Sequence, residues 1–387
     1  MSQIIFIQYG DYKLAFENLN SGGSEKYYAQ AHSVQYVESL TARFDKVLVL
    51  CLAVNYPCKV LANGVVTIGV DVSKVGASGV VNYIASLSLT HIVLRSPIVK
   101  VMSYAIKNKI ALLPILADSF VNKSIRNKVS NFFLMKILNN KSIKIVSNHS
   151  LNSCLSLVKI GVNKSKVIPW DWPHCTKPED FLVKSMSSNS PILFYAGQMT
   201  KEKGLYDLID AVGVLNKTKP VFLTIAGNDT GEKVGEYILN KGLQKQVTLL
   251  GLVPQKNVVD SMAEADAVIV PSWHEYPEGL PMTIYEGLAS RTPLIVSDHP
   301  MFTDKVVDNV SGLVFEAGNV ESLAFTCLKL FNDDDLYNMI SFNSLQAWHD
   351  LNIKDEWSQV VDYFIDDELS QVDIKNKSLM SYEVRYV

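Results

Sequence analysis

The sequence predicts an α/β protein made of two doubly wound, Rossmann-like domains, and three observations predict this class. Short apolar runs rich in β-branched residues alternate with longer helix-competent stretches along nearly the whole chain, as in parallel sheets with crossover helices. The 387 residues suffice for two hydrophobic cores, since a domain takes ~150 residues. A stretch rich in Pro, Ser and charge, 173–190, interrupts the alternation.

The first series of elements precedes this interruption. Two longer stretches, 24–43 and 97–108, are predicted as helices because they have helical patterns between apolar runs. The runs predicted as strands are 4–8, 46–52, 91–94, 111–116 and 143–147.

A second series follows it, with a helix-competent segment after each strand. The runs predicted as strands are 192–196, 221–226, 247–250, 267–271, 294–297 and 313–315. We therefore expect an N-terminal domain over 1–172, a linker over 173–190 and a C-terminal domain over 191–350; a helix at about 350–370 can pack back on the first domain. The two domains are expected to face a central cleft, with ligands at the carboxyl ends of the strands.

The composition excludes several classes of protein. With 48% apolar and 19% charged residues, the chain is that of a folded globular protein. No apolar run reaches the ~18 residues that span a bilayer, and the N-terminus lacks the features of a signal peptide, so a cytoplasmic protein is expected. The five cysteines are scattered without a C-x-x-C pair, so we expect neither a disulfide framework nor a metal site.

Charge is unevenly distributed along the chain. Residues 1–170 hold 19 Lys and Arg against 7 Asp and Glu, whereas residues 171–387 hold 17 against 32. The stretch 119–170 has nine basic residues and no acidic one. Six of the nine surround the apolar run 132–135: Lys123, Arg126, Lys128, Lys136, Lys141 and Lys144. Two interpretations stay open: a surface for anionic lipid or an anionic substrate, or a solvated helix face beside the edge of a core.

The segment 271–293, PSWHEYPEGLPMTIYEGLASRTP, is the richest in chemistry. A buried strand is expected to end at Pro271, and Gly279-Leu280-Pro281 to open a helix whose free N–H groups suit the phosphates of a nucleotide. Glu278 and Glu286 lie eight residues apart, so at ~100° per residue both can face the same cleft. The structural alternatives are an acid that favours a helix N-terminus and an exposed acid within the helix; the apolar neighbours of Glu286 argue against the second.

With these residues the segment resembles the E-x7-E signature of the large retaining nucleotide-sugar glycosyltransferase family 4, which has the two-domain GT-B fold. Other segments resemble the family as well: FYAGQMTKEKGLYDLIDAV (194–212), LTIAGN (223–228), VTLLGLVPQKNVVDSMAEADAVIVPS (247–272) and SGLVFEAGNVESLA (311–324). The resemblance extends over about 191–330 and, more loosely, over the first 50 residues.

The resemblance implies roles for individual residues. Glu286 would accept hydrogen bonds from the ribose hydroxyls, and Glu278 would bind the donor sugar. Lys203 would neutralise the leaving diphosphate, a role in which preorganised charge acts mainly in the transition state; a solvated lysine before a helix is its structural alternative. Pro281 has no N–H to donate. The residues that we expect to bind the donor are Gly22, Gly23, Gly197, Gln198, Gly227, Leu252, Val253, Gly279, Leu280, Pro281, Met282 and Glu286.

The sequence departs from the family pattern at three places. Gln198 stands where an arginine is usual, so Lys201 or Arg95 would supply the missing charge. Ala117 followed by Asp118 replaces a histidine near the reacting centre; Asp118 either contacts the donor sugar or caps the next helix. Arg291 stands where glycine is usual, at an expected helix C-terminus.

Three further features have structural alternatives. Gly22-Gly23 would let bare backbone approach a phosphate or an acceptor sugar. Arg95 ends a strand at the edge where open sheets bind ligands, and we assign it to the acceptor side. Asp333 and its two acidic neighbours are more typical of a helix start than of a metal site.

Together these features predict a retaining glycosyltransferase that moves a sugar from a nucleotide diphosphate sugar to an acceptor hydroxyl, in cell-surface polysaccharide or glycolipid assembly. We expect no cofactor besides the donor substrate, a saccharide or lipid-linked acceptor, and no nucleic acid partner. The basic first half suggests attachment at the inner face of a membrane. The alternatives are a nucleotide-sugar epimerase or hydrolase of the same fold, and an inactive partner subunit.

Overall fold

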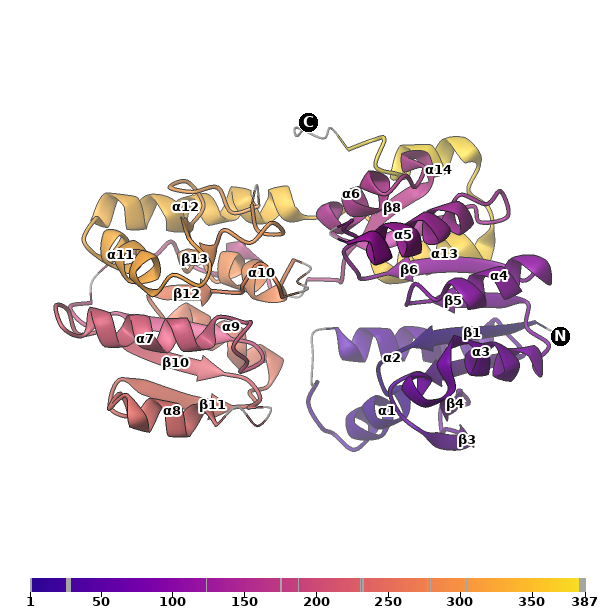
Figure 1. Ribbon diagram of the computed structural model, residues 1–387, viewed down its shortest axis with the longest axis horizontal. Coiled ribbons are helices and arrows are strands. Elements are labelled where there is room, and N and C mark those ends of the chain that lie inside the picture. Colours follow the sequence, from indigo (N-terminus) through magenta and orange to yellow (C-terminus); the bar gives the residue numbers. More distant parts are fainter. Residues whose placement is uncertain are drawn as a thin grey trace. The chain divides into compact units, whose positions relative to one another are not determined.

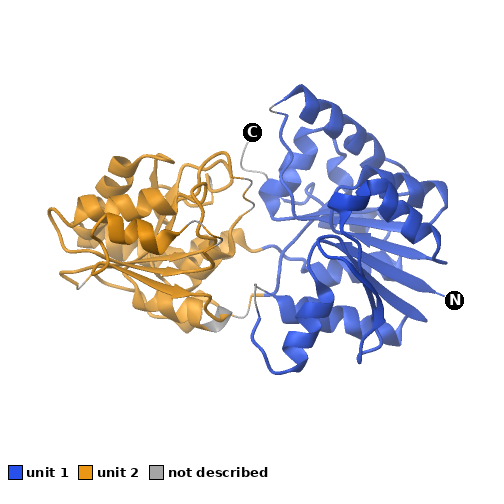
Figure 2. Ribbon diagram, turned by 60° about the horizontal axis from the view of Figure 1, so that its bottom comes forward, with its two compact units in different colours: residues 1–173, 353–387 blue, residues 174–352 orange. Residues whose placement is uncertain are grey.

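The computed structural model describes residues 2–25, 29–122, 124–174, 176–186, 188–229, 231, 233–276, 278, 280–303 and 305–382. The chain divides into two compact units (Figure 2). Unit 1 comprises residues 1–173 and 353–387, and unit 2 comprises residues 174–352. Each unit is an α/β domain around a mainly parallel sheet (Figure 1).

The described residues of unit 1 form an eight-stranded sheet in the order β3-β4-β2-β1-β5-β6-β7-β8. The paired strands are parallel except β3, which runs antiparallel to β4 at one edge. The strands are β1 (Gln3–Gln8), β2 (Lys46–Cys51), β3 (Tyr56–Val60), β4 (Val66–Gly69), β5 (His91–Leu94), β6 (Ala111–Leu116), β7 (Val146–His149) and β8 (Val167–Trp170). The described helices are α1 (Tyr12–Asn20), α2 (Gln30–Ser39), α3 (Val72–Ala85), α4 (Val99–Lys107), α5 (Ile125–Leu138), α6 (Leu151–Lys159), α13 (Trp357–Asp366) and α14 (Gln371–Lys377).

Both faces of this sheet are buried, which explains its nearly continuous apolar strands. Ile5 and Ile7 of β1 belong to a core shared with α3, α4, α5 and α6. Ile4 and Phe6 belong to a second core, shared with α1, α2 and α13. Alternate residues of one strand therefore fill the cores on opposite faces.

Unit 2 has a six-stranded parallel sheet in the order β11-β10-β9-β12-β13-β14. Its strands are β9 (Ile192–Ala196), β10 (Phe222–Ala226), β11 (Val247–Gly251), β12 (Ala267–Val270), β13 (Leu294–Ser297) and β14 (Leu313–Phe315). Its described helices are α7 (Leu205–Leu215), α8 (Val234–Asn240), α9 (Gln255–Glu264), α10 (Met282–Ala289), α11 (Val320–Phe331) and α12 (Asp334–Leu351). Leu193 and Phe194 of β9 fill cores on opposite faces of the sheet.

The chain order reverses between β9 and β12, which are neighbours in the sheet although β10 and β11 separate them in sequence. In open α/β sheets, ligands bind at the carboxyl ends of the strands beside such a reversal. The segments that follow β9 and β12 carry Lys203 and Glu278.

The last 35 residues return to unit 1. The backbone N–H of Trp357 donates to the carbonyl of Asp171, 2.9 Å away, and the indole is fully buried 6.1 Å from the ring of Phe6. The structure places the helix expected at about 350–370 here, as α13. Its buried residues complete a core that the first 173 residues alone would leave open.

Residues expected to form a linker, 173–190, pack on unit 2 in their described part. The backbone N–H of Lys184 donates to Ser341 Oγ (2.8 Å), and the carbonyl of Pro178 accepts from Arg291 Nε (3.0 Å). His174 stacks on the Tyr285 ring at 4.6 Å. Backbone groups of this segment therefore bond buried side chains of unit 2.

Several elements differ from the sequence expectation. The long helix expected over 24–43 is wrong: α2 begins at Gln30, after Ala29 in a left-handed conformation, and a 3-10 turn follows Ser39. The strand expected over 143–147 is β7, shifted to 146–149. The sequence did not indicate α1, β3, β4 or β8. Exposed β3 and proline-containing β8 are edge strands, where apolar pattern is weak and proline is tolerated.

Two other features of the fold bear on earlier expectations. Asp333 is the N-cap of α12, and its carboxylate accepts from the backbone N–H of Leu336 (2.9 Å), as expected of a helix start. Throughout the part of the chain that the structure describes, no helix is both long and apolar enough to cross a membrane.

Candidate functional site

The residues expected to bind the donor in unit 2 gather at one edge of its sheet. Parallel strands have their carboxyl ends at the same edge. Gly197 and Gln198 follow β9, Gly227 follows β10, and the segment 271–286 follows β12. Leu252 and Val253 follow β11 at the outer end of the same edge. The sheet order therefore brings together motifs that are up to 90 positions apart in the sequence.

The centre of this edge is a group of three polar side chains, of which Glu278 and Ser272 are buried and Lys203 is partly exposed. Lys203 Nζ contacts Glu278 Oε1 in an ion pair, and the same oxygen accepts a hydrogen bond from Ser272 Oγ at 2.8 Å. Glu278 is 8% exposed and Ser272 1%. A buried carboxylate needs such partners because burial of an unpaired charge is costly. Glu278 is thus held in one place by two groups from different loops.

The ring of Tyr276 lies against the lysine. Lys203 Nζ lies 4.6 Å from the centroid of the Tyr276 ring, and the Tyr276 hydroxyl lies 3.4 Å from Gln198 Oε1. The carbonyl of Gln198 accepts from the buried Tyr195 hydroxyl at 2.6 Å. Burial raises the pKa of Tyr195 well above its usual range, and the nearby Glu278 carboxylate adds to this shift, so the phenol stays a donor.

Gly204 explains how the loops after β9 and β12 come so close. It precedes α7 with a φ of +70°, and a Cβ on it would lie 2.0 Å from the carbonyl oxygen of Pro271. The backbone N–H of Trp273 also donates to the carbonyl of Glu202 (2.9 Å). Only glycine permits this approach, which sets Lys203 opposite Glu278.

Gly227 allows a second close approach. A Cβ on Gly227 would lie 1.8 Å from the carbonyl oxygen of Gly197, so the turns after β9 and β10 are in backbone contact. Gly197 and Gly227, both expected to bind the donor, are therefore also needed for this backbone contact, whether or not a ligand binds.

Glu286 lies within α10, whose residues 284–289 are all buried, and is itself 8% exposed. The alternative of an exposed acid within the helix is thereby excluded. Pro281 is the N-cap of α10, and within the described part of the chain no side-chain hydrogen bond caps this end of the helix. Leu280 is buried, Met282 is the first residue of α10, and Gly279 lies outside the described residues.

A histidine that the sequence analysis overlooked supports the loop of Glu278. His299 is buried; its Nε2 lies 3.1 Å from the carbonyl oxygen of Tyr276, and its Nδ1 accepts from the backbone N–H of Met301 at 3.1 Å. These partners require a neutral ring with the proton on Nε2. Burial lowers the pKa of His299 below its ordinary value, which favours this form.

Other contributors were also missed, because their partners are distant in sequence. Ser272 meets Glu278, and the indole N–H of Trp273 donates to Asp207 Oδ2 at 2.5 Å. The only available signal for Ser272 and Trp273 was their position just after a strand. Lys201, which the sequence analysis offered as a replacement for the charge missing at Gln198, is exposed, and its ammonium lies 5.4 Å from the Trp273 ring.

The remaining expected residues belong to unit 1. Gly22 adopts a φ of +82° just after α1, and the N–H of Gly23 donates to the carbonyl of Asn18, so the pair ends a helix. Arg95 follows β5 and lies 5.4 Å from the rings of both Trp172 and Trp357, with Nη1 3.3 Å from Gln8 Oε1.

Asp118 follows β6, also at the carboxyl edge of the unit 1 sheet. The alternative that it caps the next helix is wrong, because Ser124 is the N-cap of α5. Its backbone is held by Asn148, which donates to the Asp118 carbonyl (2.8 Å) and accepts from its N–H (3.2 Å). Desolvation raises the pKa of its carboxyl group.

Arg291 has the left-handed conformation expected for the position where glycine is usual, with a φ of +58° after the C-cap of α10. Its guanidinium donates to the carbonyls of Pro178 and Phe342, so the side chain offsets the backbone strain. Among the described residues, no three His, Cys, Asp or Glu side chains are grouped as metal ligands.

Known proteins are similar to the second unit in sequence and to nearly the whole chain in fold. Residues 177–346 match the family model of glycosyl transferases group 1. The amylovoran biosynthesis glycosyltransferase AmsK of Erwinia amylovora is 29% identical over 161 residues, which are 40% of each chain. This chain therefore spans about two fifths of the length of the curated relatives that it matches first.

Two solved structures resemble nearly the whole chain. Sucrose-phosphate synthase from Thermosynechococcus elongatus superposes with a TM-score of 0.65 at 16% identity, covering 95% of this chain and 99% of that one. The Anabaena protein Alr3699/HepE in complex with UDP gives 0.64 at 16% identity with the same coverage. The expected fold class, two α/β domains with parallel sheets, is confirmed. The chain therefore has the two-domain fold of these structures, and its residues 177–346 match the glycosyl transferases group 1 family.

Proposed function

We propose that this protein is a retaining glycosyltransferase that moves a sugar from a nucleotide diphosphate sugar to an acceptor hydroxyl. The observation that supports this best is the contact of Lys203 with the buried pair Glu278 and Ser272 at the carboxyl edge of the unit 2 sheet. Glu286 and the N-terminus of α10 lie on the segment that follows Glu278. Positive charge, fixed carboxylates and free N–H groups are what a sugar diphosphate would need in such a place.

In this proposal the bond between the anomeric carbon and the diphosphate oxygen breaks while the bond to the acceptor oxygen forms. Lys203 neutralises the charge that grows on the leaving diphosphate, and the acceptor proton passes to that leaving group. Glu278 binds the donor sugar and balances positive charge at the anomeric carbon. No cofactor besides the donor substrate is needed, since Lys203 supplies the positive charge.

Glu286 accepts hydrogen bonds from the ribose hydroxyls in this proposal, as the family 4 resemblance and its E-x7-E motif imply. Gly197, Gly227, Leu252 and Val253 line the same sheet edge and would contact the nucleotide. The N–H groups that begin α10 would approach the diphosphate. The complex of the similar Anabaena structure contains UDP, which makes UDP the first nucleotide to test.

We assign the acceptor to unit 1, where Arg95 and Asp118 lie at the carboxyl edge of the sheet. The relative AmsK is described as an amylovoran biosynthesis enzyme. By analogy we propose that the acceptor is a saccharide or a lipid-linked saccharide of cell-surface polysaccharide or glycolipid assembly, used at the inner face of the membrane.

Nucleotide binding is the first test of this function. Titration calorimetry with UDP, GDP, ADP and dTDP should identify one or more ligands, and Glu286→Gln should weaken the best by about 1.5 to 3 kcal/mol, because a charged acceptor is lost. Glu264→Gln, an equal charge change at an exposed position of α9, is the matched control and should bind as the parent does. Equal affinities of the parent and Glu286→Gln would contradict the ribose assignment.

Turnover separates the transferase from its alternatives. The protein should consume the donor sugar only when a saccharide acceptor is present, and nuclear magnetic resonance should show the donor's anomeric configuration in the product. Free sugar released at the same rate without acceptor would favour a hydrolase, and a new epimer of the donor would favour an epimerase.

A further inference from the structure

Helix α5 has two apolar faces. Leu134 and Leu138 point inward and are buried in the core of unit 1. Ile125, Val129, Phe132 and Phe133 are 82%, 52%, 48% and 56% exposed. The structure therefore splits the apolar run 132–135, which the sequence analysis treated as one block: its aromatic pair faces outward and Leu134 inward.

The outward residues form one stripe. At ~100° per residue, positions 125, 129, 132, 133 and 136 fall within an arc of ~100° on the helix. Lys136 lies over the Phe132 ring, with Nζ 4.7 Å from its centroid. Arg126 and Lys128 fall on either side of the stripe and are exposed. An exposed apolar stripe between basic residues is the pattern of helices that lie in a membrane interface.

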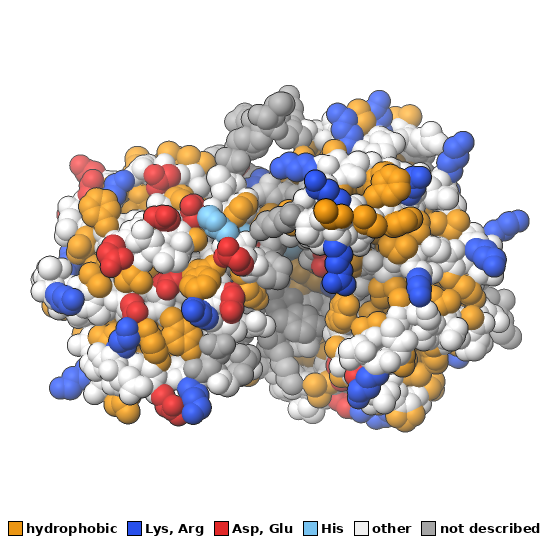
Figure 3. Space-filling model, in the orientation of Figure 1, with side chains coloured by type: hydrophobic (Ala, Val, Ile, Leu, Met, Phe, Trp, Pro, Cys, Tyr) orange, Lys and Arg blue, Asp and Glu red, His pale blue; other side chains and the backbone are white. Residues whose placement is uncertain are grey.

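No acidic residue interrupts this surface on α5 or on α4, the helix that packs against it. Helix α4 adds the exposed residues Lys100 and Lys107. From residue 72 to 170 the sequence contains one acid, Asp118. Figure 3 shows basic and hydrophobic side chains together over this part of unit 1, whereas acidic side chains are frequent over unit 2.

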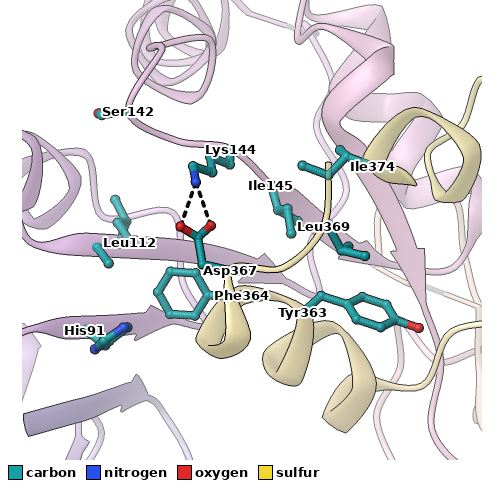
Figure 4. A pocket seen from close by; sticks show the side chains of 11 residues that line it. His91, Leu112, Ser142, Lys144, Ile145, Tyr363, Phe364, Asp367, Leu369 and Ile374 are labelled. Carbon is teal, nitrogen blue, oxygen red and sulfur yellow. Dashed lines mark hydrogen bonds and ion pairs between the residues drawn. The ribbon is translucent and has the colours of Figure 1, made fainter. Parts of the chain in front are cut away.

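Some basic residues of the stretch 119–170 do not belong to this surface. Lys144 makes an ion pair with Asp367 (2.6 and 2.7 Å) at a cavity of about 120 Å³ beside α13 (Figure 4). Lys166 Nζ donates to the carbonyls of Leu138 and Asn140. Lys123 lies outside the described residues. The docking surface therefore reduces to Ile125, Arg126, Lys128, Val129, Phe132, Phe133 and Lys136, which we name the α5 face.

We propose that the α5 face attaches unit 1 to an anionic lipid membrane. Arg126, Lys128 and Lys136 contact the headgroups, while Ile125, Val129, Phe132 and Phe133 enter the boundary between headgroups and acyl chains. Charge complementarity favours this occupant over a second copy of the chain, because two α5 faces would bring like charges together. The attachment does not depend on which sugar or nucleotide unit 2 binds.

Vesicle sedimentation tests the proposal with the full chain. Binding should be strong to vesicles of equal parts phosphatidylglycerol and phosphatidylcholine, absent with phosphatidylcholine alone, and weaker as salt is added. Each basic residue strengthens such binding about fivefold, so R126E/K128E/K136E should weaken it by roughly 100-fold or more. Phe132→Ser with Phe133→Ser should also weaken it at constant salt, which a purely electrostatic contact would not.

A matched variant controls for net charge. K217E/K245E/K354E changes the charge equally at exposed positions away from the α5 face and should bind vesicles nearly as the parent does. Equal loss in both triple variants, or equal binding to neutral vesicles, would overturn the proposal. Light scattering without lipid tests the other occupant. If the protein self-associates through Phe132 and Phe133 and does not bind vesicles, the α5 face is a contact between copies of the chain and the membrane proposal is wrong. Circular dichroism and thermal unfolding of each variant verify that unit 1 is folded.

Discussion

At the residue scale, the candidate site depends on charges that are held by specific neighbours. Lys203 is restrained by the Glu278 carboxylate and the Tyr276 ring, whereas Lys201 is exposed beside Trp273. Preorganised charge contributes most when it is already in place before the transition state forms. This difference agrees with the separate roles that the family resemblance implied for the two lysines.

Lys203→Gln should therefore lower kcat by about 10²- to 10³-fold with a smaller effect on donor binding, because charge on the leaving diphosphate develops mainly in the transition state. Lys201→Gln should change kcat far less. Steady-state kinetics with the identified donor measure both. A rise in KM with an unchanged kcat for Lys203→Gln would show that Lys203 contacts the donor only in the ground state. A loss of kcat in Lys201→Gln as large as that in Lys203→Gln would show that Lys201 supplies the positive charge that Gln198 lacks.

His299 should make the stability of unit 2 depend on pH. Burial lowers the pKa of His299 in the folded state, so below about pH 6.5 the unfolded chain binds the proton more readily. The contribution of His299 to the free energy of unfolding is then present above about pH 6.5 and decreases as the pH falls toward the folded-state pKa. His299→Gln does not titrate, so the stability difference between parent and variant should shrink from about pH 7.5 to about pH 5.5.

Denaturant titrations at both pH values measure this difference. Comparing parent and variant removes the contribution of His91, whose pKa burial also lowers. A stability difference that stays constant over this range would contradict the proposed neutral role of His299.

At the element scale, the site depends on a close approach between the loops that precede α7 and α10. Gly204 and Gly242 have the same φ of +70°, yet they differ in surroundings: a Cβ on Gly204 would meet the Pro271 carbonyl at 2.0 Å, and one on Gly242 would meet nothing within 4 Å. Substitution of Gly242 therefore introduces backbone strain alone, whereas substitution of Gly204 introduces the same strain and a steric clash.

Gly242→Ala should cost about 1 to 2 kcal/mol of stability, the strain of a left-handed alanine. Gly204→Ala should cost this amount and about 1 to 3 kcal/mol more, since the β12 loop must move. It should also weaken nucleotide binding, because Lys203 and Glu278 would shift apart. Chemical denaturation and calorimetric titration measure these effects; equal losses of stability in both variants would show that the loops can separate without cost.

At the scale of the whole molecule, the C-terminal segment changes the charge of the unit that it joins. Unit 1 contains 23 Lys and Arg against 16 Asp and Glu, and unit 2 contains 13 against 23. The net charges are thus +7 and −10. Acidic residues of the segment 353–387 pair with basic residues away from the α5 face: Asp362 with Arg43 (2.9 Å) and Asp367 with Lys144. These two ion pairs offset basic charge at Arg43 and Lys144, which lie outside the α5 face.

Trp357 should stabilise unit 1 without contributing to the nucleotide site. Trp357→Ala removes a fully buried indole and should cost about 3 to 5 kcal/mol. Phe325→Ala, at a 70% exposed position of α11, is the control and should cost little. Thermal unfolding should show a lower midpoint for Trp357→Ala only, while calorimetry below that midpoint gives an unchanged affinity for the nucleoside diphosphate. Loss of nucleotide binding in a folded variant would contradict the assignment of the site to unit 2.

Much of the fold could be predicted from the sequence because its central strands are buried on both faces. The structure has central strands at His91–Leu94, Ala111–Leu116, Ile192–Ala196 and Leu294–Ser297, and the sequence analysis gave these same bounds. A parallel strand covered by helices on two sides leaves a continuous apolar run, which is a local signal. Edge strand β3, with four exposed residues, leaves none.

The candidate site likewise has features that local sequence determines and features that depend on the tertiary structure. The sequence alone determined that Glu278 precedes a helix and that Glu286 lies within it, since strand, loop and helix follow one another locally. Only the tertiary structure decided that Lys203 meets Glu278, 75 positions away, and that His299 and Ser272 hold the same loop. Likewise, Lys144 pairs with Asp367, 223 positions away, and so leaves the basic surface that the sequence suggested. Ion pairs and hydrogen bonds between distant segments depend on strand order and close backbone approach, which local residue patterns do not encode.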